Sequence, residues 1–67
     1  MKFGIVKRWD PLKGFGFITT DEGDDVFLHV SNLAPSLDPR RIEEGMRVKF
    51  DIRSDIKGDQ AVNVRKA

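Results

Sequence analysis

The sequence contains no cysteine and only one histidine, His29. No disulfide can form, and a single imidazole cannot complete the ligand shell of a structural zinc ion. With 67 residues the chain is long enough for one domain, and a domain of this size buries only about 60% of the surface that its unfolded chain exposes. The fold must therefore be stabilised by a small apolar core.

Long apolar runs are also missing. No segment approaches the roughly 20 apolar residues of a membrane-spanning helix, and the first residues lack the basic-then-apolar build of a signal peptide. We expect a soluble, cytoplasmic protein. There is no phosphate-binding loop and no nucleophile–histidine set, and the carboxylates fall mostly in turns. We therefore expect no enzyme activity, no cofactor or metal, and no small-molecule substrate.

The charges are unevenly spread although the net charge is only +1. Residues 1–20 contain four basic residues and one acidic residue, whereas residues 21–25 contain four acidic residues. One interpretation is a basic surface on the first two strands, with the acidic turn lying away from it. The other is that acidic residues are simply enriched in a turn. Charge alone does not separate the two.

Short stretches rich in β-branched and aromatic residues alternate with turns that contain glycine, proline or aspartate. The clearest alternation of apolar and charged residues is 46–53. Two prolines exclude a long strand between 31 and 44, and we expect an exposed loop over 37–41. Closing five short strands into a small barrel would remove exposed strand edges. The predicted strands are 3–9, 15–20, 26–30, 46–53 and 60–65.

Side chains alternate across a strand, so Phe15 and Phe17 share one face, and so do Phe27 and His29. If these rings were the core, the aliphatic residues opposite them would be exposed together, which is the costlier arrangement. We therefore predict outward-facing rings. The predicted core consists of Val6, Ile18, Val26, Leu28, Val30, Met46, Val48, Phe50, Ile52, Val62 and Val64.

Exposed rings are costly unless they are used. An unpaired base that stacks on an aromatic side chain gains about 1–3 kcal/mol. Lys7, Arg8 and Lys13 are close in sequence to the rings and could contact phosphates. The pattern thus predicts a surface for single-stranded RNA or DNA.

The segments 13–18, Lys-Gly-Phe-Gly-Phe-Ile, and 26–30, Val-Phe-Leu-His-Val, resemble the two ribonucleoprotein motifs of the bacterial cold-shock proteins. The resemblance covers essentially the whole chain. It implies a single cold-shock domain over residues 1–67, an all-β, five-stranded antiparallel barrel of the OB type. It also implies binding of single strands with little sequence preference and a role as an RNA chaperone or cold-shock regulator of transcription or translation. The nucleic-acid-binding residues would be Lys7, Arg8, Trp9, Lys13, Phe15, Phe17, Phe27 and His29.

The chain departs from the family pattern at several positions. It has Arg8-Trp9-Asp10 where the family usually has Trp-Phe-Asn, and Trp9 is interpreted as replacing the phenylalanine. Arg8 is either a stacking cation or an ordinary surface residue. Val30 and the loop 34–41 lack rings that the family often carries. We expect binding that is weaker and more salt-dependent than is typical of the family.

Small barrels serve many functions. The alternative is therefore a protein-interaction or dimerising module with weakened nucleic-acid binding. We expect a monomer, with a dimer as the alternative.

Overall fold

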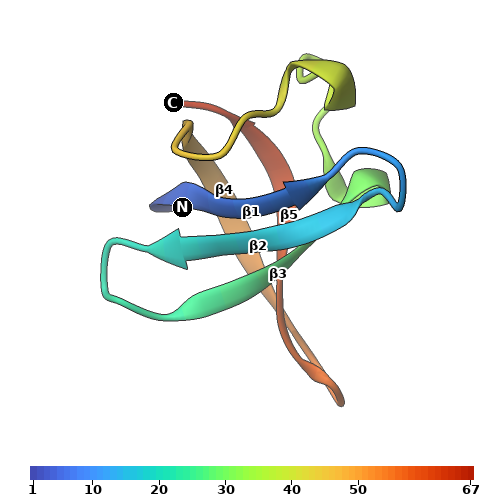
Figure 1. The fold of residues 1–67 in the computed structure, drawn as a ribbon. Helices are drawn as coiled ribbons and strands as arrows, with labels where there is room; N and C mark the ends of the chain where they lie inside the picture. Colours follow the sequence, from blue (N-terminus) through green and yellow to red (C-terminus); the bar gives the residue numbers. More distant parts are fainter.

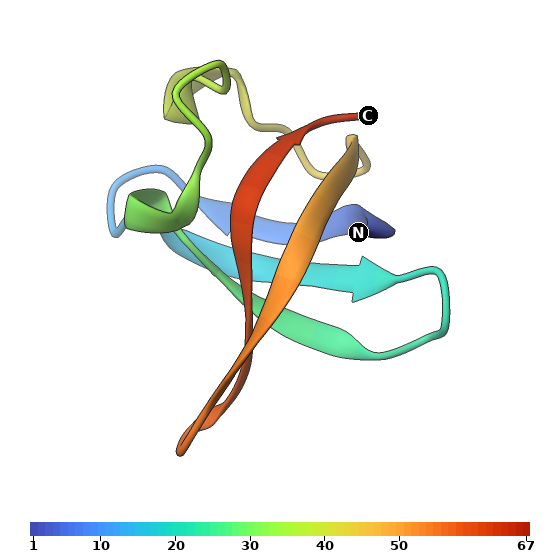
Figure 2. The same cartoon turned by 180° about the vertical axis from the view of Figure 1, so that it is seen from behind.

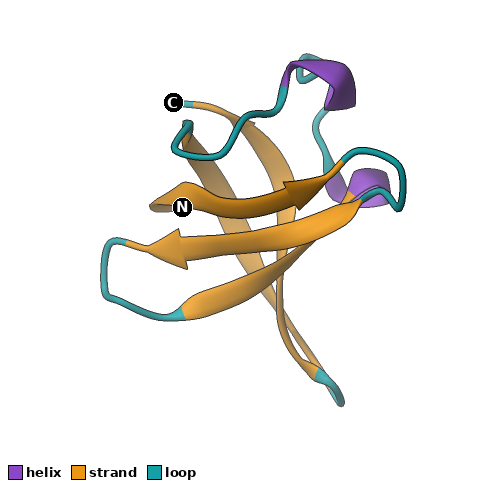
Figure 3. Ribbon diagram, in the orientation of Figure 1, coloured by secondary structure: helices purple, strands orange, loops and turns teal.

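The computed structural model describes all 67 residues as a closed barrel of five strands. Figures 1 and 3 show the strands crossing around a common interior, with two short 3-10 helices between the third and fourth strands. The elements are β1 (Lys2–Asp10), β2 (Phe15–Thr20), β3 (Asp25–His29), η1 (Val30–Asn32), η2 (Pro39–Arg41), β4 (Arg47–Asp55) and β5 (Gly58–Lys66).

Around the barrel the strands follow the order β1-β2-β3-β5-β4. The strands β1, β2 and β3 lie toward the viewer in Figure 1, and β4 and β5 lie toward the viewer in Figure 2. The predicted all-β, five-stranded barrel is confirmed. The all-antiparallel prediction is wrong at one place, because β3 and β5 pair in parallel. A closed ring with an odd number of strands cannot alternate direction at every contact, so one parallel pair is unavoidable.

Most of the predicted core is confirmed. Met46, Ile52 and Val62 are only partly buried. The prediction that Val30 is buried is wrong. Strand β3 ends at His29 and Val30 begins η1, where its side chain is 38% exposed. The predicted core residues that are buried are Val6, Ile18, Val26, Leu28, Val48, Phe50 and Val64.

The segment between β3 and β4 lies at one end of the barrel (Figure 1). Leu37 and Ile42 are buried against the core, so the prediction of an exposed loop over 37–41 is wrong for Leu37. The Asp38 side chain accepts a hydrogen bond from the backbone N–H of Arg40 and caps η2. The loop therefore covers this end of the barrel with Leu37 and Ile42.

A β-bulge interrupts β1 at Lys7. Val6 pairs with Ile18 and Arg8 pairs with Phe17, so Lys7 has no partner of its own. Such an extra residue breaks the strict inward–outward alternation of a strand. Lys7 and Arg8 are therefore both exposed, and the next residue, Trp9, points inward.

Candidate nucleic-acid interface

Four aromatic side chains gather on the outer face of β2 and β3, as predicted. Strand register places Phe15 opposite His29 and Phe17 opposite Phe27. The Phe27 ring lies in the middle, with its centroid 6.0 Å from that of Phe15, 5.8 Å from that of Phe17 and 6.2 Å from that of His29. Phe15 and Phe17 are 37% and 38% exposed. We call Phe15, Phe17, Phe27 and His29 the ring face.

The rings lie outside because the interior is already filled. On the opposite side of the same strands Ile18, Val26 and Leu28 are buried. Edge and tilted contacts between the rings recover part of the cost of their exposure. The exposed parts of these rings form an aromatic surface on which unpaired bases can stack.

The close approach of β1 explains why the residue between the two phenylalanines of β2 is a glycine, Gly16. A Cβ at this position would lie 1.9 Å from the Arg8 carbonyl oxygen and 2.9 Å from the Trp9 Cα. The bulged backbone of β1 therefore presses directly on Gly16. This close approach holds Arg8 beside Phe17.

His29 is oriented by the start of η1. Its Nδ1 accepts a hydrogen bond from the backbone N–H of Ser31 at 3.1 Å and lies 2.8 Å from the Ser31 hydroxyl. Since Nδ1 accepts from a backbone N–H, the neutral ring carries its proton on Nε2. That nitrogen is thus a hydrogen-bond donor beside the exposed rings.

Arg8 and Lys13 provide the uncompensated positive charge next to the rings. Neither side chain is in an ion pair with an acidic residue. They line one depression with Asp10, Phe15 and Phe17. This placement fits the predicted phosphate contacts, because cations close to stacked bases meet the backbone that connects them.

Lys7 was predicted to be free for phosphate contact, but its side chain is in an ion pair. Its Nζ lies 2.9 Å from Asp25, which also accepts a hydrogen bond from the Thr19 hydroxyl at 3.0 Å. The hydrogen bond from Lys7, and secondly that from Thr19, lower the pKa of Asp25 below its ordinary value. Asp25 is thus a stable anion at neutral pH, and the charge of Lys7 is largely compensated.

Two acidic residues of the β2–β3 turn are also engaged. Glu22 lies 2.6 Å from the Lys2 Nζ, and Asp21 binds the Arg47 guanidinium through two hydrogen bonds of 3.1 and 2.8 Å. The acidic turn therefore does not lie away from the basic residues. It neutralises several of them, and the net positive charge near the rings comes mainly from Arg8 and Lys13.

The structure contradicts the predicted role of Trp9 as a binding residue. Its side chain is 8% exposed and belongs to the apolar core, where the indole Nε1 has no hydrogen-bond partner. The bulge at Lys7 is the reason, because it turns Trp9 inward and Arg8 outward. Arg8 therefore lies on the surface beside Phe17, and Trp9 does not.

A groove beside the rings was not foreseen from the sequence. Phe17 and Phe27 form one wall, and the β4–β5 hairpin forms the other, enclosing about 480 Å³. Gln60 lies opposite Phe27, and its amide oxygen accepts from Asn32 at 3.3 Å while its amide nitrogen donates to Asp55 at 2.9 Å. No local sequence signal could have found this groove, because it depends on the parallel pairing of β3 and β5.

No three His, Cys, Asp or Glu side chains lie close enough together to hold a metal ion. Among the helices of the structure, none has the length and apolarity needed to cross a membrane.

Comparison with known proteins agrees with this geometry. Residues 2–67 match the family described as 'Cold-shock' DNA-binding domain. Cold shock protein CspC of Bacillus subtilis is 45% identical over 67 residues, covering 100% of both chains. The Major cold shock protein of Streptococcus pyogenes serotype M6 is 46% identical over 66 residues, covering 98% of this chain and 97% of its own. Cold shock protein 1 of Lactiplantibacillus plantarum is 45% identical over 64 residues, covering 96% of both. The ring face, the closed five-stranded barrel and these matches together show that the chain belongs to the cold-shock DNA-binding domain family.

Proposed function

We propose that this protein binds single-stranded RNA or DNA on the ring face, with little sequence preference. The observation that carries the proposal is the outward cluster of Phe15, Phe17, Phe27 and His29, with ring centroids about 6 Å apart. Stacking accepts any base, because every base has a π-face. A surface dominated by stacking therefore discriminates weakly between sequences.

The side chains around the rings take complementary roles. Arg8 and Lys13 contact phosphates, and the exposed ion pair of Lys7 with Asp25 can exchange for a phosphate. The Nε2–H of His29 donates to a base. The groove beside Phe27 receives a base edge, which the oriented amide of Gln60 can meet.

The proposed cellular role is that of an RNA chaperone or cold-shock regulator in the cytoplasm. A protein that stacks bases on its own rings competes with base pairing, so it keeps RNA single-stranded without a cofactor. The relatives named above carry cold-shock names, which supports this role. We propose that the protein acts as a monomer.

Fluorescence anisotropy with a labelled oligo-U about six nucleotides long, within the usual site size of such barrels, tests the proposal. Phe17→Ala is expected to weaken binding by about 1–3 kcal/mol, the contribution of one stacked base. For this short probe Phe3→Leu is the control, because Phe3 is an exposed ring outside the ring face. Thermal unfolding of both variants shows whether they remain folded.

Saturable binding by the native protein, weakened by Phe17→Ala and not by Phe3→Leu, supports the proposal. No binding, together with a dimeric mass in light scattering, would instead identify the protein as a dimerising module.

A further inference from the structure

A second cluster of aromatic and basic side chains lies on the outside of β1, β4 and β5. Phe3 pairs across the sheet with Lys49, and Lys49 pairs with Arg65. Cross-strand partners point to the same face of a sheet, so the three side chains stand side by side. Phe3 is 41% exposed. We call these three residues the Phe3 surface. Lys49 and Arg65 lie on β4 and β5, the strands toward the viewer in Figure 2, and Phe3 lies on the neighbouring β1.

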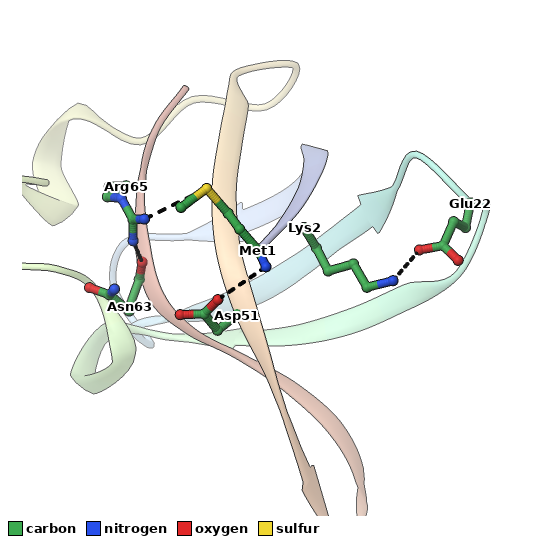
Figure 4. Close-up of polar contacts among 6 residues, drawn as sticks. All are labelled: Met1, Lys2, Glu22, Asp51, Asn63 and Arg65. Atoms are coloured by element: carbon green, nitrogen blue, oxygen red, sulfur yellow. Dashed lines mark hydrogen bonds and ion pairs between the residues drawn. The ribbon is translucent and has the colours of Figure 1, made fainter.

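No carboxylate is bound to the cations of this surface. Neither Lys49 nor Arg65 is in an ion pair. The Arg65 guanidinium instead donates to the carbonyl oxygen of Asn63 at 2.9 Å and lies 3.8 Å from the sulfur of Met1. Figure 4 shows Met1 across β4, between Arg65 and Asp51; the Asp51 carboxylate lies 3.6 Å from the Met1 amino group.

A bulge in β5 places Arg65 on this surface. Lys49 pairs with Arg65, but Asp51 pairs with Val62, so β5 has one more residue than β4 in this interval. Asn63 adopts a left-handed conformation there, with φ 53°, which asparagine tolerates better than most residues. The next residue, Val64, is buried and Arg65 points outward. Strict alternation from the buried Ala61 would have turned Arg65 inward.

Arg47 holds the ring of Phe3 in place. Its guanidinium lies 5.6 Å from the Phe3 ring centroid and is itself held by two hydrogen bonds to Asp21. The Phe3 ring is therefore oriented by a cation–π contact. Its remaining exposed surface lies next to the unpaired charge of Lys49.

We propose that the Phe3 surface is a second contact site for single-stranded nucleic acid, reached by a strand that extends beyond the ring face. The inference rests on the function proposed above. An aromatic ring beside unpaired cations offers the same stacking and phosphate-binding chemistry as the ring face. The two surfaces share β1, where Arg8 and Phe3 are about 16 Å apart at about 3.3 Å per residue, with the exposed Ile5 between them.

The salt dependence of binding, measured with two probe lengths, tests this site. We use oligo-U of about 6 and about 20 nucleotides, which bracket the usual site sizes of such barrels. Each phosphate contact adds about −0.7 to the slope of log affinity against log salt for single strands. For the Lys49→Ala/Arg65→Ala double variant we expect the slope for the long probe to lose about 1.4 in magnitude, and that for the short probe to stay unchanged. Phe3→Leu should weaken binding of the long probe by about fivefold or more.

The matched control is Arg41→Ala/Lys66→Ala, which removes the same charge from two exposed residues that lie together elsewhere on the barrel. The proposal is overturned if this control lowers the salt slope as much as Lys49→Ala/Arg65→Ala does. It is also overturned if Lys49→Ala/Arg65→Ala leaves binding of the long probe unchanged, or if it weakens binding of both probes equally. A concentration-dependent dimer that Phe3→Leu abolishes would also overturn it, by assigning the surface to a second copy. If the native protein fails to bind the short probe, the ring-face function itself is refuted.

Discussion

Replacing Gly16 by alanine tests how β1 and β2 are held together. The added Cβ would lie 1.9 Å from the Arg8 carbonyl oxygen and 2.9 Å from the Trp9 Cα. Both are backbone atoms that cannot rotate away, so the two strands must separate at the bulge. Overpacking typically costs about 1–3 kcal/mol, occasionally more, and a clash with backbone places Gly16→Ala at the upper end, about 3 kcal/mol.

That loss is large for a small domain. At about 0.05–0.15 kcal/mol per residue, a chain of this length has only about 3–10 kcal/mol of stability. A loss of 1 kcal/mol lowers the Tm of such a domain by about 4–8 °C, so we expect Gly16→Ala to lower it by more than about 10 °C. Urea unfolding gives the free energy of unfolding directly.

Gly23→Ala is the comparison. Gly23 has φ +94°, and a Cβ there would meet nothing within 4 Å. Its cost is backbone strain alone, about 1–2 kcal/mol for a left-handed residue. If Gly16→Ala proves no more destabilising than Gly23→Ala, the close approach of the β1 bulge to Gly16 is refuted, and with it the explanation for the positions of Arg8 and Trp9.

Two further predictions concern Arg8 and Asp25. Arg8→Trp restores the ring that the family usually carries. We expect the binding free energy of short oligo-U to improve by about 1–3 kcal/mol from stacking and the log–log salt slope of binding to fall by about 0.7 in magnitude. An unchanged slope in anisotropy titrations would show that Arg8 contacts no phosphate. Hydrogen bonds from Lys7, and secondly from Thr19, lower the pKa of Asp25 in the folded protein. The stabilisation of the fold by these contacts is therefore fully present above the ordinary Asp pKa of 3.8, and it is lost as pH falls through the lower pKa of the folded state. The difference in Tm between the native protein and Asp25→Asn should therefore be small but measurable at pH 7 and shrink in acid; a difference that is constant with pH would argue against the ion pair.

Local patterns were sufficient for the fold class and for the ring face. The period-two alternation in β2 and β3 separates Ile18 and Leu28 from Phe15 and Phe17 without reference to any other strand. The same alternation identifies Val48 and Phe50 as buried. These predictions are local because side-chain direction in a regular strand depends only on position within that strand.

Positions at bulges and strand ends could not be predicted in this way. One extra residue at Lys7 exchanges the faces of Arg8 and Trp9, and one at Asn63 turns Ala61 into the core in place of Val62. The period-two pattern does not contain either bulge, because each arises from the register between two strands. Val30 was misplaced for a related reason, since η1 begins where the β3 alternation would have continued.

The sequence by itself determined that the chain is an all-β barrel with aromatic side chains outside and aliphatic side chains inside. Tertiary structure decided which cations remain free, because the partners of Lys2 and Lys7 are distant in sequence, one in the β2–β3 turn and one at the start of β3. It also decided that Leu37 covers the barrel end and that Gln60 lies beside Phe27. The physical reason is that alternation is a property of one strand, whereas ion pairs, bulges and barrel closure depend on contacts between residues far apart in the chain.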